Sequence, residues 1–518
     1  MQHNLFSALR AGWPADLDAT AIECADGAPL HSPLHYTWGD IERSTAMLAN
    51  LLASLGLPEG ARVAVQTEKS VEALLLYLAV LRAGLVYLPL NTAYQAGEIE
   101  YFIGNAEPSV VVCSGKNFGW VSKLAFKAGT AHVFTLNDDR TGSLLQRAAH
   151  HSAEHTPVQR AADDLAAILY TSGTTGRSKG AMLSHANLLS NARVLQLAWG
   201  WRTPAEGGDV LIHALPIFHV HGLFVASHGA LLNGSKMLWF SRFNAKAVAA
   251  RLPEATLFMG VPTLYVRLLA EGTFTRDACR TMRLFISGSA PLLIETFDDF
   301  RTRTGHTILE RYGMSETVML TSNPYAASDG ERRGGTVGRP LPGVGVRLVN
   351  ESGTPCASGE IGGVEVTGAN VFKGYWRLPE KTAEEFTADA WFKTGDVGRF
   401  DAQGYLTIVG RSKDLVITGG YNVYPAEVEG LLNELAGVQE SAVIGVPHAD
   451  FGEAVVAVVV ARPGTPPDAA SLVGGLKSKI ANFKVPKQVF VVNELPRNTM
   501  GKVQKNLLRE QHKGLFAR

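Results

Sequence analysis

A dense group of hydrogen-bond donors lies at residues 170–180, Tyr-Thr-Ser-Gly-Thr-Thr-Gly-Arg-Ser-Lys-Gly, directly after the apolar run Leu165–Leu169. Glycine lets a backbone approach an anion closely, and the hydroxyls, the backbone N–H groups and the Lys179 ammonium can together hold the oxygens of a triphosphate. The segment does not fit the Walker A spacing of glycines, lysine and serine or threonine. It therefore predicts a phosphate-binding loop of another kind. A flexible, solvated loop is the alternative that composition alone leaves open.

The same segment contains Gly176-Arg-Ser-Lys-Gly180, which matches the Gly-x-Ser-x-Gly pattern of serine hydrolases and makes Ser178 a formal nucleophile. A nucleophile elbow requires its serine at a sharp turn directly after a strand. Here five residues rich in glycine, serine and threonine separate the predicted strand from Gly176, so an esterase is disfavoured.

Five more short motifs follow the loop along the chain. They are Arg-Tyr-Gly-Met-Ser-Glu-Thr (311–317), Lys-Thr-Gly-Asp (393–396), Gly-Arg-Ser-Lys-Asp (410–414), Gly-Gly-Tyr-Asn-Val-Tyr-Pro (419–425) and Pro-Arg-Asn-Thr-Met-Gly-Lys (496–502). In this order they resemble the motifs of the adenylate-forming superfamily, which includes acyl-CoA synthetases, luciferases and peptide-synthetase adenylation domains. Segments 67–74, 215–222, 284–291, 446–453 and 498–505 are similar to malonyl-CoA synthetases in particular.

The resemblance implies an enzyme that couples malonate to coenzyme A, with methylmalonate as an alternative acid. ATP, bound with Mg²⁺, would be cleaved to AMP and diphosphate through an acyl-adenylate. Three alternatives remain open: a ligase for short monocarboxylates, an acyl donor to a carrier protein, and a non-catalytic nucleotide sensor. A sensor would not need Lys502, so the presence of this lysine favours an enzyme.

The resemblance also implies which residues hold the nucleotide. They are Thr171, Ser172, Gly173, Thr174, Thr175, Gly176 and Lys179 of the loop, together with Ser289, Ala290, Pro291, Arg311, Tyr312, Gly313, Asp396 and Arg411. The Asp396 carboxylate would accept both ribose hydroxyls. Lys502 would be the lysine that stabilises charge during adenylation, Glu316 the magnesium-associated carboxylate and Thr317 a contact to the α-phosphate.

A second carboxylate in the acid needs a buried partner, or it will not enter the pocket. The candidates are Arg267, Ser287 and, shaping the acyl side, His219 and Met314. Arginine can bind a carboxylate through two parallel hydrogen bonds. A solvated helix face is the alternative for Arg267. Arg283 is a nearby rival, but its place before a predicted strand favours a structural role.

Apolar periodicity predicts the elements that position these residues. Helices are predicted at Ile41–Leu55 and Val71–Leu81, and strands at 62–66, 85–90 and 109–113. The alternation predicts an α/β protein with a large N-terminal domain, residues 1–410, built from mixed and parallel sheets flanked by helices. Residues 411–518 are predicted to form a small α+β domain on a hinge, with a helix opening at Pro425 and strands at 441–446 and 455–461.

By the same resemblance, Lys413 would be the hinge residue between the two domains. Gly419, Gly420 and Tyr421 would line the tunnel for the pantetheine of coenzyme A after the small domain rotates. Rotation would also keep water from the acyl-adenylate.

Composition excludes several other functions. Lysine plus arginine and aspartate plus glutamate number 48 each, and this balance disfavours a nucleic-acid or anionic-membrane partner. Four separate cysteines with no Cys-x-x-Cys disfavour a zinc site or a disulfide scaffold, so we expect a cytoplasmic protein. The apolar stretch 73–90 contains Arg82, Gly84 and Pro89, so it predicts a buried helix and strand rather than a membrane span. The oligomeric state is left open.

Overall fold

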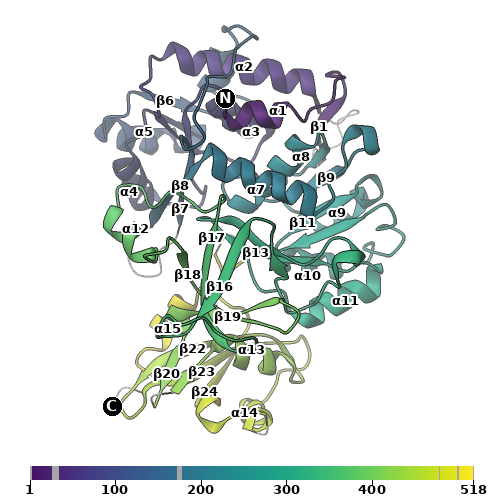
Figure 1. The fold of residues 1–518 in the computed structure, drawn as a ribbon, viewed down its shortest axis with the longest axis vertical. Helices are drawn as coiled ribbons and strands as arrows, with labels where there is room; N and C mark the ends of the chain where they lie inside the picture. The colour runs from purple at the N-terminus through teal and green to yellow at the C-terminus, as the bar shows by residue number, and fades with distance from the viewer. Residues whose placement is uncertain are drawn as a thin grey trace. The chain divides into compact units, whose positions relative to one another are not determined.

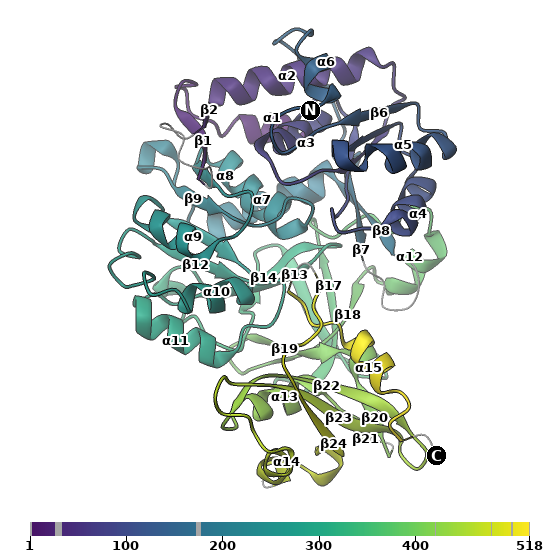
Figure 2. The same ribbon diagram turned by 180° about the vertical axis from the view of Figure 1, so that it is seen from behind.

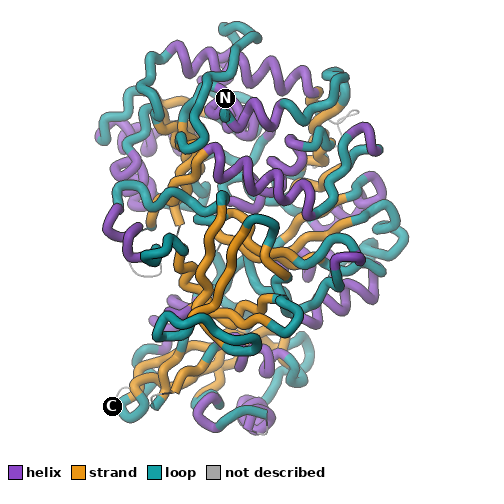
Figure 3. The backbone as a smooth tube through the Cα atoms, in the orientation of Figure 1, coloured by secondary structure: helices purple, strands orange, loops and turns teal. Residues whose placement is uncertain are grey.

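The computed structural model describes residues 3–25, 34–171, 178–419, 421–477, 479–498 and 501–516 (Figure 1). The chain divides into two compact units. The first comprises Met1–Gly345 and Thr367–Phe392, and the second comprises Val346–Val366 and Lys393–Arg518. Both units combine helices with strands (Figures 2 and 3), which confirms the predicted α/β class with a large and a small part.

The first unit contains a mainly parallel sheet, in the order β6-β5-β3-β4-β7-β8 among the described residues. Its strands are β3 (Arg62–Gln66), β4 (Val86–Pro89), β5 (Val110–Cys113), β6 (His132–Thr135), β7 (Leu165–Thr171) and β8 (Lys179–Ser184). Only the last pair is antiparallel, with Thr171 opposite Lys179. The β7–β8 hairpin therefore brackets the predicted phosphate loop.

A second sheet of the first unit has the order β15-β14-β13-β12-β11-β9-β10-β1-β2 in the described part of the chain. Its strands are β1 (Thr20–Cys24), β2 (His35–Thr37), β9 (Val210–His213), β10 (Lys236–Trp239), β11 (Leu257–Gly260), β12 (Leu284–Ser287), β13 (Leu309–Met314), β14 (Val318–Ser322) and β15 (Arg339–Pro340). Strands β9 to β13 run parallel to one another. Their carboxyl ends meet at one edge, where parallel sheets commonly bind ligands.

Helices cover these sheets. They are α1 (Leu5–Arg10), α2 (Trp38–Ser54), α3 (Val71–Arg82), α4 (Ala96–Ala106), α5 (Phe118–Lys127), α6 (Ser143–Ala148), α7 (His185–Ala198), α8 (His228–Leu232), α9 (Ala245–Arg251), α10 (Pro262–Leu269), α11 (Ile294–Thr304) and α12 (Pro379–Glu385). Every residue of α3 is buried, and Arg82 at its end is paired with Glu42 at 2.8 Å. This confirms the buried helix expected there. No helix among the described residues is long and apolar enough to cross a membrane.

The second unit contains most of a four-stranded sheet, β16-β17-β18-β19, and a five-stranded sheet in which β24 joins the path β21-β20-β23-β22, both counted over the described residues. The strands are β16 (Val344–Val349), β17 (Ile361–Gly368), β18 (Phe392–Phe400), β19 (Leu406–Arg411), β20 (Val416–Thr418), β21 (Tyr421–Val423), β22 (Val438–His448), β23 (Gly452–Ala461) and β24 (Gln488–Val492). Its helices are α13 (Pro425–Asn433), α14 (Ala469–Lys477) and α15 (Lys505–His512). The start of α13 at Pro425 and the strands predicted at 441–446 and 455–461 are confirmed.

The limits of the compact units differ from the predicted domain boundary at residue 411. Residues 393–410 cluster with the second unit because β18 pairs antiparallel with β19, with Asp396 opposite Arg411. A rotating hinge at Lys413, and the domains 1–410 and 411–518 that it would separate, stay predictions.

Candidate active site

Lys179 lies at the start of β8 and is held by two side chains of segment 375–385. Its Nζ lies 3.3 Å from a Glu385 carboxylate oxygen and 4.1 Å from the centre of the Tyr375 ring. Thr171 across the hairpin donates its hydroxyl to the Lys179 carbonyl at 3.4 Å. Residues 172–177, which include the predicted Ser172, Gly173, Thr174, Thr175 and Gly176, lie outside the described residues.

Tyr375 also connects Lys179 to Glu316. The Tyr375 hydroxyl donates to Glu316 Oε1 at 3.0 Å, and the Glu316 side chain is buried. The neighbouring Thr317 is fully buried, and its Oγ1 finds no hydrogen-bond partner within the described residues. The structure thus brings together two predicted phosphate-site residues, Lys179 and Glu316, around an aromatic residue that sequence analysis did not select, with Thr317 next to Glu316 in sequence.

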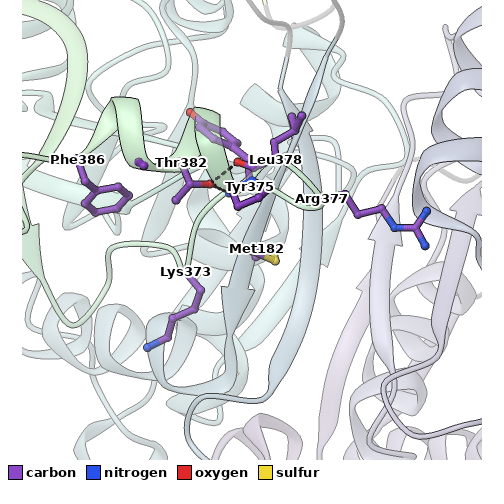
Figure 4. Close-up of a pocket in the computed structure, with 9 residues that line it drawn as sticks. Met182, Lys373, Tyr375, Arg377, Leu378, Thr382 and Phe386 are labelled. Carbon is purple, nitrogen blue, oxygen red and sulfur yellow. Dashed lines mark hydrogen bonds between the residues drawn. The ribbon is translucent and has the colours of Figure 1, made fainter.

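A pocket of about 470 Å³ lies beside Tyr375 (Figure 4). It is lined by Met182, Lys373, Tyr375, Arg377, Leu378, Pro379, Thr382, Ala383 and Phe386. The Tyr375 N–H donates to the Thr382 hydroxyl at 2.9 Å. Figure 4 shows Lys373 and Arg377 pointing away from Thr382 and Phe386, and each cation is already paired, with Asp163 and Glu107 respectively. The pocket therefore lacks an uncommitted cation for phosphate.

A different arrangement is found at the ends of β12 and β13. Ser287 ends β12 opposite Glu310, and Arg311 is the next residue of β13. A Cβ atom at Gly288 would lie only 2.6 Å from Arg311 Cζ, so the guanidinium packs directly against the glycine backbone. Both Ser287 and Arg311 are buried, and Ser287 Oγ and Arg311 Nε and Nη2 find no partner in the described structure. Burial lowers the pKa of the Arg311 guanidinium.

Two histidines face the same region. His219, which was predicted, accepts a hydrogen bond at Nδ1 from the His221 backbone N–H at 3.3 Å. His221 opens a π-helix, His221–Ser227, and its Nδ1 lies 3.3 Å from the Ser289 hydroxyl. Burial, and then the nearby charge of Arg311, lower the pKa of His221 well below its usual value. Sequence analysis missed His221, although it lies in the same Phe-His-Val-His-Gly segment as His219.

The β13–β14 hairpin positions the remaining residues of the predicted adenine and acyl sites. A Cβ atom at Gly313 would lie 1.8 Å from the Val318 carbonyl oxygen, so only glycine fits there. Tyr312 and Met314 on either side are half-buried. Ser289 has a φ of 72°, a left-handed conformation that side chains seldom adopt. Ala290 follows half-buried, and Pro291 is exposed.

The two candidate arginines differ in their surroundings. Arg267 lies in the last turn of α10 with an exposed side chain, and no described residue pairs with it. Arg283, whose side chain is 9% exposed, forms an ion pair with the buried Asp209, with Nη2 2.6 Å from a carboxylate oxygen. The structural role expected for Arg283 is therefore confirmed.

In the second unit, the charged groups of three predicted residues, Asp396, Arg411 and Lys502, interact with one another. Asp396 is buried and pairs with Arg411 Nε at 2.9 Å. Lys502 follows Gly501, whose φ is 73°, and its N–H donates to Asn498 Oδ1 at 2.9 Å. Lys502 as a residue is exposed, but protein atoms around its ammonium, and then the charge of Arg411, lower the pKa of that group. Lys505 is instead bound to Glu429 at 2.6 Å, which favours Lys502 as the available lysine.

Of the predicted hinge and coenzyme A residues, Lys413 lies in a 3-10 turn before β20, Gly419 directly follows β20, and Tyr421 begins β21. Lys413 is exposed, and Gly419 has a φ of 57°. Tyr421 is 60% exposed and stacks on Phe483, with ring centres 4.6 Å apart. Gly420 lies outside the described residues.

Comparison with known proteins identifies the family. The AMP-binding enzyme family matches residues 14–376, and the AMP-binding enzyme C-terminal domain matches residues 427–502. A malonate–CoA ligase of Arabidopsis thaliana is 34% identical over 488 residues, which cover 88% of this chain and 78% of that protein. A feruloyl-CoA synthase of an Amycolatopsis species is also 34% identical, over 93% of this chain and 95% of its own.

Among solved structures, the ATP-bound MatB from Rhodopseudomonas palustris is 52% identical, covers all of both chains and superposes with a TM-score of 0.94. Motifs, fold and comparisons agree over nearly the whole sequence. The chain therefore belongs to the AMP-binding enzyme family, whose members include the adenylate-forming enzymes that its motifs resemble.

Proposed function

We propose that this protein is a malonate–CoA ligase, which converts ATP, malonate and coenzyme A to malonyl-CoA, AMP and diphosphate through malonyl-adenylate. The family match supports the adenylation chemistry, and the Arabidopsis relative supports the acid. A feruloyl-CoA synthase is as similar to this chain as the Arabidopsis relative is, but MatB is more similar than either. The residues of the acyl side give a second, independent argument for the acid.

The observation that carries the proposal is the buried Arg311 guanidinium. A buried cation is costly unless an anion pairs with it. Arg311 Nε and Nη2 find no partner within the described residues. Its charge acts on His221, whereas Lys179 and Glu316 gather around Tyr375. The missing anion is thus better supplied by the second carboxylate of malonate than by the triphosphate, and this revises the nucleotide role first predicted for Arg311.

The other acyl-side residues complete a polar pocket. Ser287 offers a buried hydroxyl, and we assign His219, two residues before the π-helix, and Met314, the last residue of β13, to the same side. Arg267 remains a candidate for the same carboxylate, and its exposed side chain would reach the acid only at the mouth of the pocket. Methylmalonate would place one additional methyl group among these side chains.

On the phosphate side, Lys179 and the hydroxyls of the loop would hold the β- and γ-phosphates. The Thr317 hydroxyl would donate to an oxygen of the α-phosphate. Tyr312, Ser289, Ala290 and Pro291 would bound adenine, with Gly313 allowing the close turn between them. Asp396 and Arg411 would bind the ribose.

The residues fit a magnesium ion that is held chiefly by ATP. No group of three or more His, Cys, Asp and Glu side chains in the described residues could hold a metal alone. Mg²⁺ commonly binds one or two carboxylates together with phosphates and water, and Glu316 is the carboxylate that we assign. When bound, the ion would neutralise charge that develops on the departing diphosphate.

We assign the adenylation step to Lys502. Its ammonium would bridge the attacking carboxylate and the α-phosphate oxygens as negative charge moves between them. Rotation about Lys413 would then bring Gly419, Gly420 and Tyr421 to the pantetheine of coenzyme A, whose thiol displaces AMP.

The proposed acid is tested by pyrophosphate exchange with acetate, propionate, malonate, methylmalonate, succinate and octanoate, followed by thioester formation with coenzyme A. We expect malonate to exceed acetate and octanoate in catalytic efficiency by at least about tenfold, equivalent to about 1.4 kcal/mol. Equal use of acetate or octanoate would overturn the diacid assignment and leave the family unchanged.

The role of Lys502 is tested by separating the half-reactions. Lys502→Ala should slow adenylation by about 10²-fold or more, because one well-placed electrostatic stabiliser is removed. Supplied with synthetic malonyl-adenylate, the same variant should form malonyl-CoA at nearly the wild-type rate. Lys505→Ala is the control and should retain adenylation. Equal slowing of both half-reactions by Lys502→Ala would contradict domain rotation.

A further inference from the structure

Lys69 has no role in the proposed reaction, yet its ammonium is fully engaged. It lies between β3 and α3 and donates to the His213 carbonyl at 2.8 Å, the Phe240 carbonyl at 2.7 Å and His213 Nδ1 at 3.0 Å. A lysine ammonium has three N–H donors, and each of these three oxygen and nitrogen atoms can accept one of them. The ammonium also lies 4.3 Å from the centre of the Trp239 ring.

This contact fixes the proton of His213. An ammonium can only donate, so His213 Nδ1 must be the unprotonated nitrogen of the ring. The proton of the neutral ring is then on Nε2. Burial, and then the charge of Lys69, lower the pKa of His213 well below its usual value, so the ring stays neutral. Stacking on Trp239, with ring centres 4.6 Å apart, holds its plane.

The Nε2–H group points at the π-helix. It lies 3.0 Å from the Gly222 carbonyl and 2.9 Å from the Ser227 hydroxyl, and that hydroxyl itself donates to Gly222 at 2.9 Å. A Cβ atom at Gly222 would lie 2.0 Å from the Pro216 carbonyl oxygen. The first turn of the π-helix is therefore held from two sides. Single π-turns are frequent at functional sites.

That first turn carries the acyl-side histidine. His221 precedes Gly222 directly, contacts Ser289 and lies in the field of Arg311. A chain of contacts thus runs from Lys69 through His213 and Gly222 to the residues of the proposed acyl side. With the opposite tautomer of His213, a lone pair would face the Gly222 carbonyl and the contact would become repulsive.

We propose that Lys69 is a positioning residue for adenylation: through the tautomer that it imposes on His213, it holds the π-helix and thereby His221 at the acyl side. Lys69 acts through His213 and not on the reacting atoms. The inference needs only the adenylation activity of the family, so it is tested with whichever carboxylate the wild-type protein uses best. Failure of the malonate assignment leaves it intact.

The first test needs no substitution at Lys69. In protein labelled with ¹⁵N-histidine, the His213 signals, identified among the 15 histidines by their loss in His213→Gln, should show protonated Nε2 and unprotonated Nδ1 near neutral pH. Lys69→Met should give a mixture of tautomers. A wild-type proton on Nδ1 would overturn the proposal.

The second test is kinetic. We expect Lys69→Met to lower kcat/KM for the carboxylate by at least about tenfold in pyrophosphate exchange, with the KM for ATP changed less than about twofold. Lys116→Met is the matched control, because it removes an exposed lysine that is paired with Glu68 at 2.6 Å. It should resemble the wild type. An equal loss in both variants, or a loss expressed in the KM for ATP, would contradict the proposal.

A double-mutant cycle tests whether Lys69 acts through His213. The Lys69→Met/His213→Gln protein should be no slower than His213→Gln alone, whereas multiplied losses would mean independent roles and would overturn the proposal. If Lys69→Met does not fold, Ser227→Ala replaces it. Ser227→Ala removes the hydroxyl that accepts from the His213 Nε2–H group, so it should lower kcat/KM for the carboxylate about threefold with little change in the KM for ATP. An unchanged kcat/KM for the carboxylate would contradict the proposed role of His213 in holding the π-helix.

Discussion

The phosphate side and the acyl side of the first unit treat their charged groups in opposite ways. On the phosphate side, Lys179 rests against Glu385 and Tyr375, and Glu316 accepts the Tyr375 hydroxyl. On the acyl side, Arg311 and Ser287 are buried with polar atoms that find no partner in the described chain. The phosphate side can therefore exchange one anion for another when ATP arrives, whereas the acyl side must acquire an anion that it lacks.

This difference has an energetic meaning. Paired charges contribute to the folded protein before any ligand binds, but an unpartnered buried cation destabilises it until the ligand arrives. If Arg311 binds the second carboxylate as proposed, an acid without that carboxylate leaves the cation unpaired, and part of the selectivity then comes from the instability of the empty protein.

The largest effect is expected for Arg311→Met. Removal of one partner of a buried charge pair costs roughly 2–5 kcal/mol, so the catalytic efficiency with malonate should fall by at least about thirtyfold while acetate use changes little. The empty variant should also unfold at a higher temperature than the wild type, because the unpaired cation is gone. Pyrophosphate exchange and thermal denaturation without ligands measure the two effects.

Arg267→Ala is the matched control for that experiment, since it removes an exposed arginine of neighbouring α10. Its loss should be smaller and should leave the unfolding temperature unchanged. A larger selective loss for Arg267→Ala than for Arg311→Met would move the second carboxylate to Arg267.

Lys179→Met should give the next largest effect, and it should have the opposite character. Loss of a charged donor to a phosphate costs about 1.5–3 kcal/mol, so the KM for ATP should rise by about tenfold or more with every acid alike. The empty variant should be no more stable than the wild type, because Glu385 loses a partner. A gain in stability would show that Lys179, like Arg311, was unpaired in solution.

Tyr375→Phe should have a smaller effect on the phosphate side. It keeps the ring against Lys179 but removes the hydrogen bond to Glu316, worth about 1 kcal/mol, so activity at limiting magnesium should fall about fivefold. Excess magnesium should recover much of the loss. An equal deficit at all magnesium concentrations would separate Glu316 from the metal.

The smallest effect on activity is expected for Glu310→Gln. Burial raises the pKa of Glu310 to about 8, although Leu292 N–H donates to its carboxyl group. A raised pKa means that the folded protein holds this proton more tightly than the unfolded chain. Its contribution is complete below the unfolded pKa, near 4.5, and is lost as pH rises through about 8.

Thermal denaturation between about pH 6 and pH 9 measures this contribution. The unfolding temperature of Glu310→Gln relative to that of the wild type should rise by a few degrees as pH increases, because glutamine has no proton to lose. A constant difference in unfolding temperature would mean that Glu310 does not titrate in this range.

Local patterns predicted the elements well where burial is uniform. The run at 62–66 and the helix from Val71 correspond to β3 and α3, because the apolar side chains of both segments must be buried in the core. The motifs that resemble the family pointed to Lys179, Glu316 and Asp396, whose roles stay predictions. The limits of the compact units were beyond reach, since they depend on which strands pair across long stretches of sequence.

The residues that sequence analysis missed act through contacts between distant segments. Tyr375 lies 59 residues from Glu316, and Lys69 lies 144 residues from His213. No periodicity or spacing signals such a pair. The sequence also did not show that Arg267 is exposed. Helical spacing tells which residues share a face of a helix, but not which face packs against the rest of the protein. The cytoplasmic location and the hinge stay predictions, and the oligomeric state stays open.

The second unit is assembled from two separate stretches of chain, Val346–Val366 and Lys393–Arg518. A fragment that begins at residue 393 would lack β17, which borders β18 in the sheet. The nine-residue β18 would then have an open edge, the kind of surface on which chains aggregate. Recombinant production of the small unit by itself should therefore start near residue 344, with residues 367–392 replaced by a short linker.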